Sequence, residues 1–269
     1  MQLVADNLTV TNPVVRRAID DLDPGPVQEL VKRCLDAGAE AIDINPGPLK
    51  RDPERRMTFL VEAVQAITDK PLLLDTTNPA ALEAGLVACR NAAIINGFFL
   101  DPFRLEHILP LAARFNTDIV GFLLRPNSHV PPDEAERLEI AVALYAEFRQ
   151  TGLPEERLII DPVVAPLIWD DGNVRNMAAL STIRNLPDLL GFPVRTIAGL
   201  SNLTIGDAPR SKKIRMETAY LPMLAAAGLD MALLNVFRAE TVRTARACNA
   251  LTDPKIFAWE SVPAFPDDG

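Results

Sequence analysis

Six of the apolar runs in this chain of 269 residues end in an aspartate or an asparagine. In chain order the polar residues at these ends are Asp43, Asn45, Asp75, Asn96, Asp161, Asn202 and Asn235, and the turn that holds Asn202 also contains Gly199 and Ser201. Ionised carboxylates accept hydrogen bonds, while carboxamides both donate and accept them. Burying such groups costs several kcal/mol unless they find partners. The set is therefore a candidate for binding a ligand with many hydrogen-bonding groups.

A purely structural role is the alternative for each of these residues. An aspartate or asparagine at a strand end often serves only as a helix N-cap or as an ordering group in a loop. Six strand ends with the same property favour the functional interpretation. It has most support for Asp75 and Asp161, which each follow three consecutive apolar residues, and least for Asn45 and Asn235.

The segments that must position these residues form one repeated pattern, in which short apolar runs alternate with amphipathic stretches of about 12–18 residues. Strands are predicted at 3–5, 41–44, 72–74, 92–95, 119–124, 158–160, 196–200 and 231–234, and helices at 24–37, 53–68, 78–89, 104–115, 133–149, 173–188, 212–227 and 239–250. Asp23, Asp52, Asn78 and Asp101 each precede a proline, which is typical of a capped helix start.

Eight strands that are each followed by a helix predict a (β/α)8 barrel, with an open doubly wound sheet as the alternative. We expect a single domain over 1–269, in which 253–269 is a loosely packed C-terminal extension. Active sites of such barrels lie at the C-terminal ends of the strands, where the Asp and Asn side chains would form a ring. That ring suits a flat polar heterocycle with donors and acceptors on its edge, such as a pterin.

Composition excludes several classes of partner. The chain has 27 basic and 36 acidic side chains, a net charge of −9 and no block rich in Lys or Arg, so neither nucleic acid nor an anionic membrane is expected as the main partner. No apolar run approaches the roughly 20 residues of a membrane span, and no signal peptide is visible at Met1. We therefore expect a cytoplasmic protein.

The sequence offers few residues that could form a metal site or a catalytic nucleophile. Cys34, Cys89 and Cys248 are far apart and the only histidines are His107 and His129, so no protein-bound metal is expected. Ser201 has no histidine nearby in sequence for a nucleophilic triad, and neither a G-x-G-x-x-G nor a Walker motif occurs.

Six ordered motifs give the chain a family resemblance. They are Asp-Pro-x-Pro-Val-Gln-Glu (23–29), Ala-Ile-Asp-Ile-Asn-Pro-Gly-Pro (41–48), Leu-Asp-Thr-Thr-Asn (74–78), Ile-Ile-Asn (94–96), Ile-Asp-Pro (160–162) and Gly-Leu-Ser-Asn (199–202). From about residue 3 to 250 the chain resembles the methyltetrahydrofolate:corrinoid-protein methyltransferases. These are pterin-binding TIM barrels related to dihydropteroate synthase and to the folate domain of cobalamin-dependent methionine synthase.

The resemblance implies a role for each matched residue. Asp75, Asn96 and Asp161 would hold the pterin edge, with Gly199 and Ser201 also at the folate site. Asn202 would lie near N5, which carries the methyl group, and Arg210 would line the folate site. Asp43, Asn45 and Asn235 form a second tier of candidates. Methyltetrahydrofolate would be the substrate, the cobalamin would be carried by a separate corrinoid protein, and the enzyme would be a homodimer.

The chain departs from that family in three places. The first strand continues as Ala-Asp-Asn-Leu-Thr (5–9) where relatives have a Gly-Glu-Arg-Ile-Asn-like stretch, Ile205 replaces a polar residue, and Asn235 stands where relatives often carry Asp. Two alternatives stay open: a dihydropteroate synthase-like transferase and a non-catalytic pterin-binding protein. The first lacks support because strand 8 has no Arg-x-His and strand 7 has no Ser-Arg-Lys directly at its end.

Overall fold

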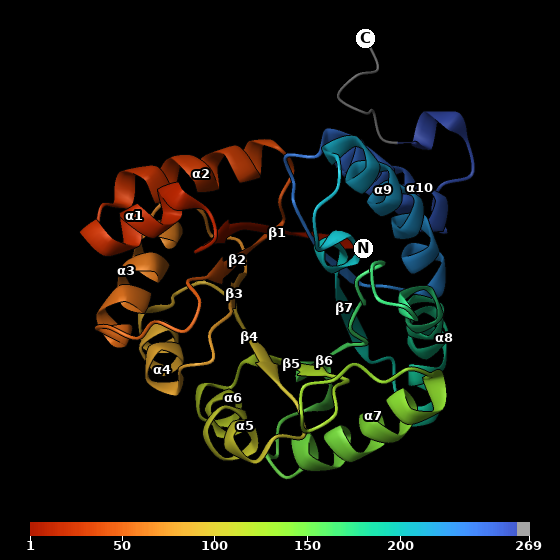
Figure 1. The fold of residues 1–269 in the computed structure, drawn as a ribbon, viewed down its shortest axis with the longest axis horizontal. Helices are drawn as coiled ribbons and strands as arrows, with labels where there is room; N and C mark the ends of the chain where they lie inside the picture. Colours follow the sequence, from red (N-terminus) through yellow and green to blue (C-terminus); the bar gives the residue numbers. More distant parts are fainter. Residues whose placement is uncertain (263–269) are drawn as a thin grey trace.

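All eight predicted strands are present, and they close in chain order into a parallel barrel (Figure 1). The computed structural model describes residues 1–262. The strands are β1 Gln2–Thr9, β2 Ala41–Asn45, β3 Leu72–Leu74, β4 Ala93–Phe98, β5 Asp118–Phe122, β6 Leu158–Asp161, β7 Arg195–Gly199 and β8 Met231–Leu234. Pairing of β1 with both β2 and β8 closes the ring. The chain is thus a single-domain (β/α)8 TIM barrel, as predicted.

A ring of helices surrounds the strands (Figure 1). The α-helices are α1 Pro13–Asp21, α2 Pro24–Asp36, α3 Pro53–Gln65, α4 Pro79–Ala88, α5 Pro102–His107, α6 Leu109–Phe115, α7 Glu134–Arg149, α8 Gly172–Leu190, α9 Arg210–Ala227 and α10 Ala239–Thr252. Short 3-10 helices are η1 Glu155–Arg157, η2 Leu200–Thr204 and η3 Trp259–Ser261.

Two features of the helix ring differ from the sequence prediction. The helix α1 was not predicted, although Asn12 caps it by accepting from the backbone N–H of Val14 and Pro13 occupies its first position. The predicted helix 104–115 is two helices that meet at Ile108, and Pro110 lies in the first turn of the second helix, where a proline is tolerated.

Three of the four expected helix caps are confirmed. Asp23, Asn78 and Asp101 each accept a hydrogen bond from a backbone N–H in the first turn of their helix. The fourth prediction was wrong: Asp52 has a φ of 43° in the left-handed region and makes no side-chain cap hydrogen bond. An N-cap residue typically has a β-region backbone, from which its side chain reaches the N–H groups of the first turn, and Asp52 lacks that backbone conformation.

One apolar side chain from each strand fills the inside of the barrel. These eight residues are Val4, Ala41, Leu73, Ile94, Val120, Ile159, Ile197 and Met231, and they pack as one buried cluster. Their neighbours along each strand point to the opposite face, because side chains alternate along a strand. This layer closes the barrel below its mouth.

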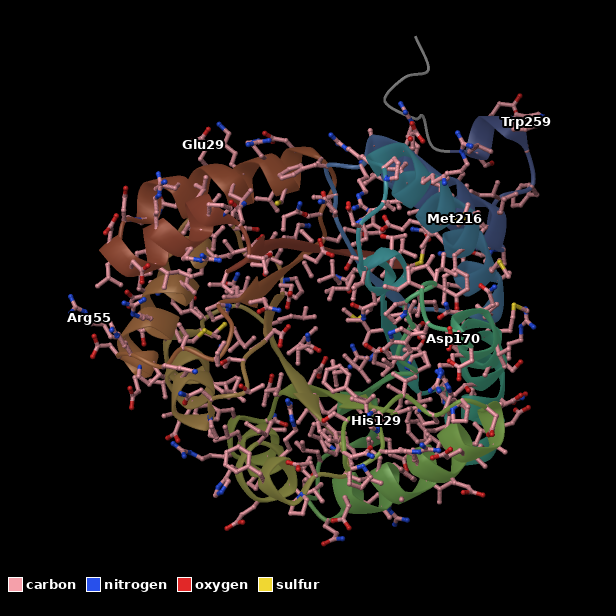
Figure 2. The ribbon with its side chains drawn as sticks, in the orientation of Figure 1. Glu29, Arg55, His129, Asp170, Met216 and Trp259 are labelled. Atoms are coloured by element: carbon pink, nitrogen blue, oxygen red, sulfur yellow. The ribbon has the colours of Figure 1, made fainter. Side chains whose placement is uncertain are left out.

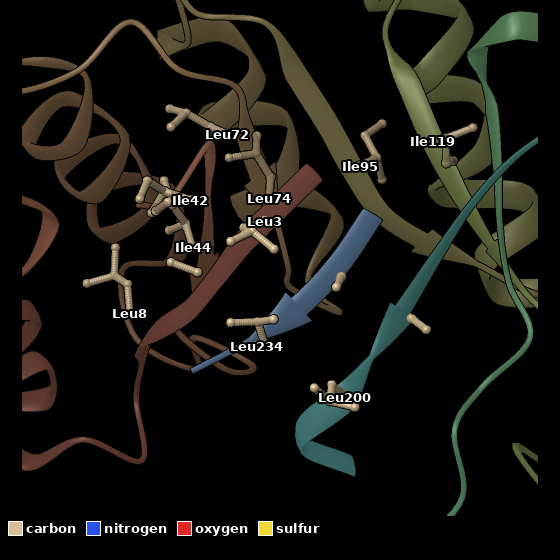
Figure 3. Packing of buried hydrophobic residues seen from close by; sticks show 14 of the residues in the cluster. Leu3, Leu8, Ile42, Ile44, Leu72, Leu74, Ile95, Ile119, Leu200 and Leu234 are labelled. Carbon is tan, nitrogen blue, oxygen red and sulfur yellow. The ribbon is translucent and has the colours of Figure 1, made fainter. Parts of the chain in front are cut away.

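The larger core lies between the outer face of the strands and the helices. Ile42, Ile44, Leu72 and Leu74 belong to it and pack together (Figure 3). All four are 1% exposed or less. Charged residues such as Glu29 and Arg55 project outward from the helix ring (Figure 2). The barrel is therefore held by two apolar layers, and its polar positions are left at the mouth.

Past α10, the described chain runs to residue 262, and its Phe257 and Trp259 are each almost 90% exposed. Trp259 lies at the outside of the molecule (Figure 2). The predicted extension 253–269 includes 263–269, which lie outside the described residues. Among the helices of residues 1–262, none is long and apolar enough to cross a membrane.

Candidate functional site

A cavity of about 720 Å³ opens at the C-terminal ends of the strands. Its lining follows from the pleat, because the residue two positions after each interior apolar residue again points inward. Those eight positions all line the cavity, and they are Asp6, Asp43, Asp75, Asn96, Phe122, Asp161, Gly199 and Leu233. Four aspartates and one asparagine thus share a floor directly above the apolar layer.

On one side of the floor, Asp75 and Asp43 lie beside Asn45. The Asn45 Nδ2 donates to Asp75 Oδ2 at 2.6 Å. Burial raises the pKa of Asp75 to about 6, although the nearby Arg104 lowers it. Burial and the charges of Asp75 and Asp6 hold the pKa of Asp43 well above its usual range. Within residues 1–262, Asp43 Oδ1 is buried without a hydrogen-bond partner. This side of the cavity can therefore satisfy a ligand that brings hydrogen-bond donors.

Asp161 occupies the C-terminal end of β6 and is 8% exposed. Its Oδ1 accepts from the backbone N–H of Val163 at 2.7 Å. Burial raises the pKa of Asp161 to about 7, while the Val163 N–H and the charge of Arg137 lower it. Near neutral pH its carboxyl group is divided between the protonated and ionised forms.

Asn96 presents its amide from β4 and is also 8% exposed. Behind it, Arg104 donates to the carbonyl oxygen of Gly97 at 2.7 Å. The same guanidinium acts electrostatically on Asp75. Arg104 therefore supports the floor from α5, a role that its helical position in the sequence did not reveal.

The turn after β7 carries Ser201 and Asn202 on η2, and both line the cavity. Gly199 makes room for this turn, because a Cβ at that position would lie 2.9 Å from Asn202 Nδ2. Ile205, which follows η2, lines the cavity too and is 52% exposed. The structure thus brings Gly199, Ser201 and Asn202 to the same mouth as Asp75, Asn96 and Asp161.

The strands β1 and β8 meet at a pair of amides. Asn7 Nδ2 donates to Asn235 Oδ1 at 2.9 Å, and Asn7 Oδ1 accepts from the backbone N–H of Val236 at 3.1 Å. Asn235 Oδ1 also accepts from the N–H of Phe237 at 3.0 Å. These bonds give Asn235 a structural task in addition to its place in the lining.

Several cavity residues were missed by the sequence analysis. They are Asp6, Asn7, Thr9, Thr11, Asn12, Phe122, Phe237 and Arg238. Asp6 was detectable, because it stands two residues after the interior Val4 on the same strand. Arg238 gave no such signal, since it follows β8 and reaches the cavity through a loop.

Arg210 does not line this cavity. It is exposed at the start of α9 and lines a separate hollow with Arg215 and Glu240, among others. That position leaves it outside the group of side chains that share the barrel mouth.

The arrangement provides acceptors and amides rather than a nucleophile. Carboxyl groups with pKa values of about 6 and 7 can receive hydrogen bonds from an N–H edge and become ionised as they do so. Asn96 and Asn202 add groups that both donate and accept. Among the residues that the structure describes, no group of three or more His, Cys, Asp or Glu side chains is arranged to hold a metal ion.

Comparisons with known proteins give a consistent picture. The family described as pterin binding enzymes matches residues 13–235. A methylcorrinoid:tetrahydrofolate methyltransferase of Eubacterium limosum is 24% identical over 239 residues, which cover 87% of this chain and 85% of that protein. Methionine synthase of Mycobacterium tuberculosis is 24% identical over 228 residues, which cover 78% of this chain but 18% of that longer protein.

Solved structures show the same fold. Dihydropteroate synthase from Stenotrophomonas maltophilia superposes with a TM-score of 0.68 at 21% identity, covering 98% of this chain and 94% of that one. The Yersinia pestis enzyme, solved with a pterine-sulfa conjugate, has a TM-score of 0.67 at 19% identity and covers 93% of both chains. Since the family match spans most of the barrel, this chain belongs to the pterin-binding enzymes.

Proposed function

We propose that this protein is a methyltransferase that moves a methyl group between N5 of methyltetrahydrofolate and the cobalt of a corrinoid carried by a separate protein. The observation that carries the proposal is the ring formed by Asp75, Asn96 and Asp161 beside Asn202, all lining one cavity. The similarity to a methylcorrinoid:tetrahydrofolate methyltransferase supports the choice of reaction.

The pterin edge would be held by the floor of the cavity. Its amino and ring N–H groups would donate to Asp75 and Asp161, and Asn96 would complement the remaining donor and acceptor positions. Both carboxyl groups have raised pKa values because of burial. A bound edge of N–H donors would return them to the ionised form, since hydrogen bonds to a carboxylate favour its charge.

Methyl transfer itself needs help at N5. Co(I) would attack the methyl carbon with its electron pair, the C–N5 bond would break with its electrons remaining on N5, and N5 would take up a proton from water or through a neighbouring carboxyl group. Tetrahydrofolate is a poor leaving group until N5 is protonated or hydrogen-bonded. Asn202 would donate to N5 as charge develops there, so it would stabilise the transition state more than the bound substrate.

The cobalt would arrive over the open mouth, on a partner corrinoid protein. The proposal also includes a homodimer, as the family resemblance implies, and a cytoplasmic location. Three free cysteines, Cys34, Cys89 and Cys248, support a reducing compartment.

Replacing Asn202 with Ala separates binding from transfer. We expect the rate of methyl transfer to fall about 100-fold, as for the loss of one donor to a developing charge, while calorimetric affinity for methyltetrahydrofolate changes far less. Asn173→Ala is the matched control, because Asn173 is exposed on α8 and lies outside the cavity lining. Equal losses of rate and affinity would contradict the proposed role.

A further inference from the structure

The buried carboxylate of Glu217 connects two loops at the mouth of the cavity. Glu217 lies on α9 and is 1% exposed. One of its oxygens accepts from the hydroxyl of Thr204, the last residue of η2. The other forms an ion pair with Arg238, which follows β8 and lines the cavity. The Glu217 side chain thus contacts both the turn that carries Asn202 and the cation that follows β8.

Arg238 has a second carboxylate within its electrostatic reach, that of Asp6. Asp6 also lines the cavity, as does Ser201, whose hydroxyl acts on the pKa of the Asp6 carboxyl group. The titratable groups that act on or near it are Arg238, Glu217, Asp43 and the Cys34 thiol. Burial raises the pKa of Asp6, while the Ser201 hydroxyl and the charge of Arg238 lower it and the charge of Glu217 raises it. The charge on this side of the cavity therefore depends on whether Arg238 pairs with Glu217 or with Asp6.

We propose that Glu217 is a positioning residue for the cavity, which fixes the Asn202 turn through Thr204 and keeps Arg238 paired away from Asp6. Asp6 then remains unpaired with Arg238 and lies with Ser201 in the cavity lining, where it can hold or release a proton next to the bound pterin. A guanidinium that is partly buried without its partner would turn to the remaining carboxylate, because an unpaired charge at such a place is unfavourable. The kinetic consequence rests on the proposed function, whereas the choice of pairing does not.

Carbon-13 NMR of aspartate-labelled protein tests the pairing directly, with Asp6→Asn identifying the Asp6 carboxyl signal. In Glu217→Gln we expect the pKa of Asp6 to fall by about one unit or more, because the charge of Glu217 is removed and Arg238 becomes free to pair with Asp6. In Arg238→Met the pKa should rise instead. The double variant Glu217→Gln/Arg238→Met should return it close to the wild-type value, which a general loosening of the fold would not do.

Kinetics test the loop half of the proposal. Thr204→Val keeps the ion pair but removes the bond to η2, and it should lower the methyl transfer rate about tenfold with less than about a threefold change in folate affinity. Glu83→Gln is the control, since it removes an ion pair to Arg114 on the outer helices. This control should change neither the rate nor the pKa of Asp6.

Failure of the proposed Arg238 pairing and failure of the proposed function give different results. An unchanged Asp6 pKa in Glu217→Gln and Arg238→Met would overturn the proposed pairing even in an active methyltransferase. Likewise, parallel losses of rate and affinity in Thr204→Val would show that Thr204 acts only on folding or binding. If the wild-type protein transfers no methyl group but the pKa values move as expected, the proposed function fails and the pairing stands.

Discussion

Four aspartates line one cavity, and the structure gives them different electrostatic surroundings. Burial raises the pKa of Asp75 to about 6 against the charge of Arg104, and it raises the pKa of Asp161 to about 7 against the Val163 N–H and the charge of Arg137. The pKa values of Asp43 and Asp6 are raised as well, and burial is the largest cause for both. These carboxyl groups therefore keep their protons to a higher pH than they would in an unfolded chain.

The raised pKa values of these carboxyl groups predict how folate binding depends on pH. Donors on the pterin edge favour ionised Asp75 and Asp161, so binding should release protons, and tetrahydrofolate affinity should rise about tenfold or more between about pH 5.5 and pH 8. Calorimetry in buffers of different ionisation enthalpy measures the protons released. In Asp161→Asn the release should become smaller. Affinity that is flat over this range would mean that the edge does not meet these carboxylates.

The free energy of unfolding of the ligand-free protein should fall as the pH rises, whereas folate affinity rises. A carboxyl group whose pKa rises from 3.8 to about 7 on folding binds a proton that the unfolded chain has lost. Its contribution is therefore most favourable below about pH 4 and is lost as the pH rises to about 7. Asp161→Asn should stabilise the ligand-free protein at pH 8 more than at pH 5, and urea unfolding at the two pH values measures that difference.

At the residue scale, the sequence analysis identified most of the polar residues of the cavity floor, but it assumed that each strand ends where its apolar run ends. Asp75, Asn96 and Asp161 were identified because each closes a buried apolar run. Asp6 was missed because Asp6 and Asn7 interrupt the apolar run, although β1 continues to Thr9. Arg238 and Glu217 were out of reach, since their pairing depends on how α9 packs against the loop after β8.

The β7–η2 turn links local backbone space to the proposed chemistry. Gly199→Ala would place a methyl group 2.9 Å from Asn202 Nδ2. We expect the fold to persist and the methyl transfer rate to drop about tenfold, because the amide must move. Gly25→Ala is the control, where the added Cβ would meet only Asp23 Oδ1 at 3.3 Å. A normal rate in Gly199→Ala would show that the position of Asn202 is not limiting.

Arg137 joins the elements behind Asp161. It is fully buried on α7 and donates to the carbonyl oxygens of Pro131, Pro162, Val163 and Arg175. Arg137→Met would leave these acceptors without a partner, and we expect a loss of about 3 kcal/mol in the free energy of unfolding. Urea denaturation measures it, with the exposed Arg149→Met on the same helix as control. A loss no larger than in the control would mean that other donors replace Arg137.

At the element scale, the strands and most helices follow from periodicity and capping, and the exceptions have local causes. The helix α1 is only nine residues long and lies between β1 and α2, where the pattern of one helix per strand left no place for it. The cap prediction at Asp52 failed because the backbone there is left-handed. Such conformations depend on loop packing that the sequence pattern does not encode.

At the scale of the whole molecule, the barrel separates apolar and polar layers by two residues along every strand. Interior positions such as Val4 and Leu73 close the base of the cavity, and the next inward positions, such as Asp6 and Asp75, form its polar floor. Barrel architecture and mouth location were therefore predictable from the sequence. Arg210 was expected among the lining residues, but it lies on another hollow because α9 begins beyond the rim.

The most direct test of the central claim measures the methylation of cobalt. The protein is mixed anaerobically with methyltetrahydrofolate and chemically reduced Co(I) cobalamin, and methylcobalamin formation is followed by its visible spectrum, with Asn202→Ala measured alongside. We predict conversion that saturates with folate and is strongly reduced in the variant. Folate binding by calorimetry without any methylcobalamin, from free cobalamin or from a corrinoid protein, would contradict the methyltransferase account.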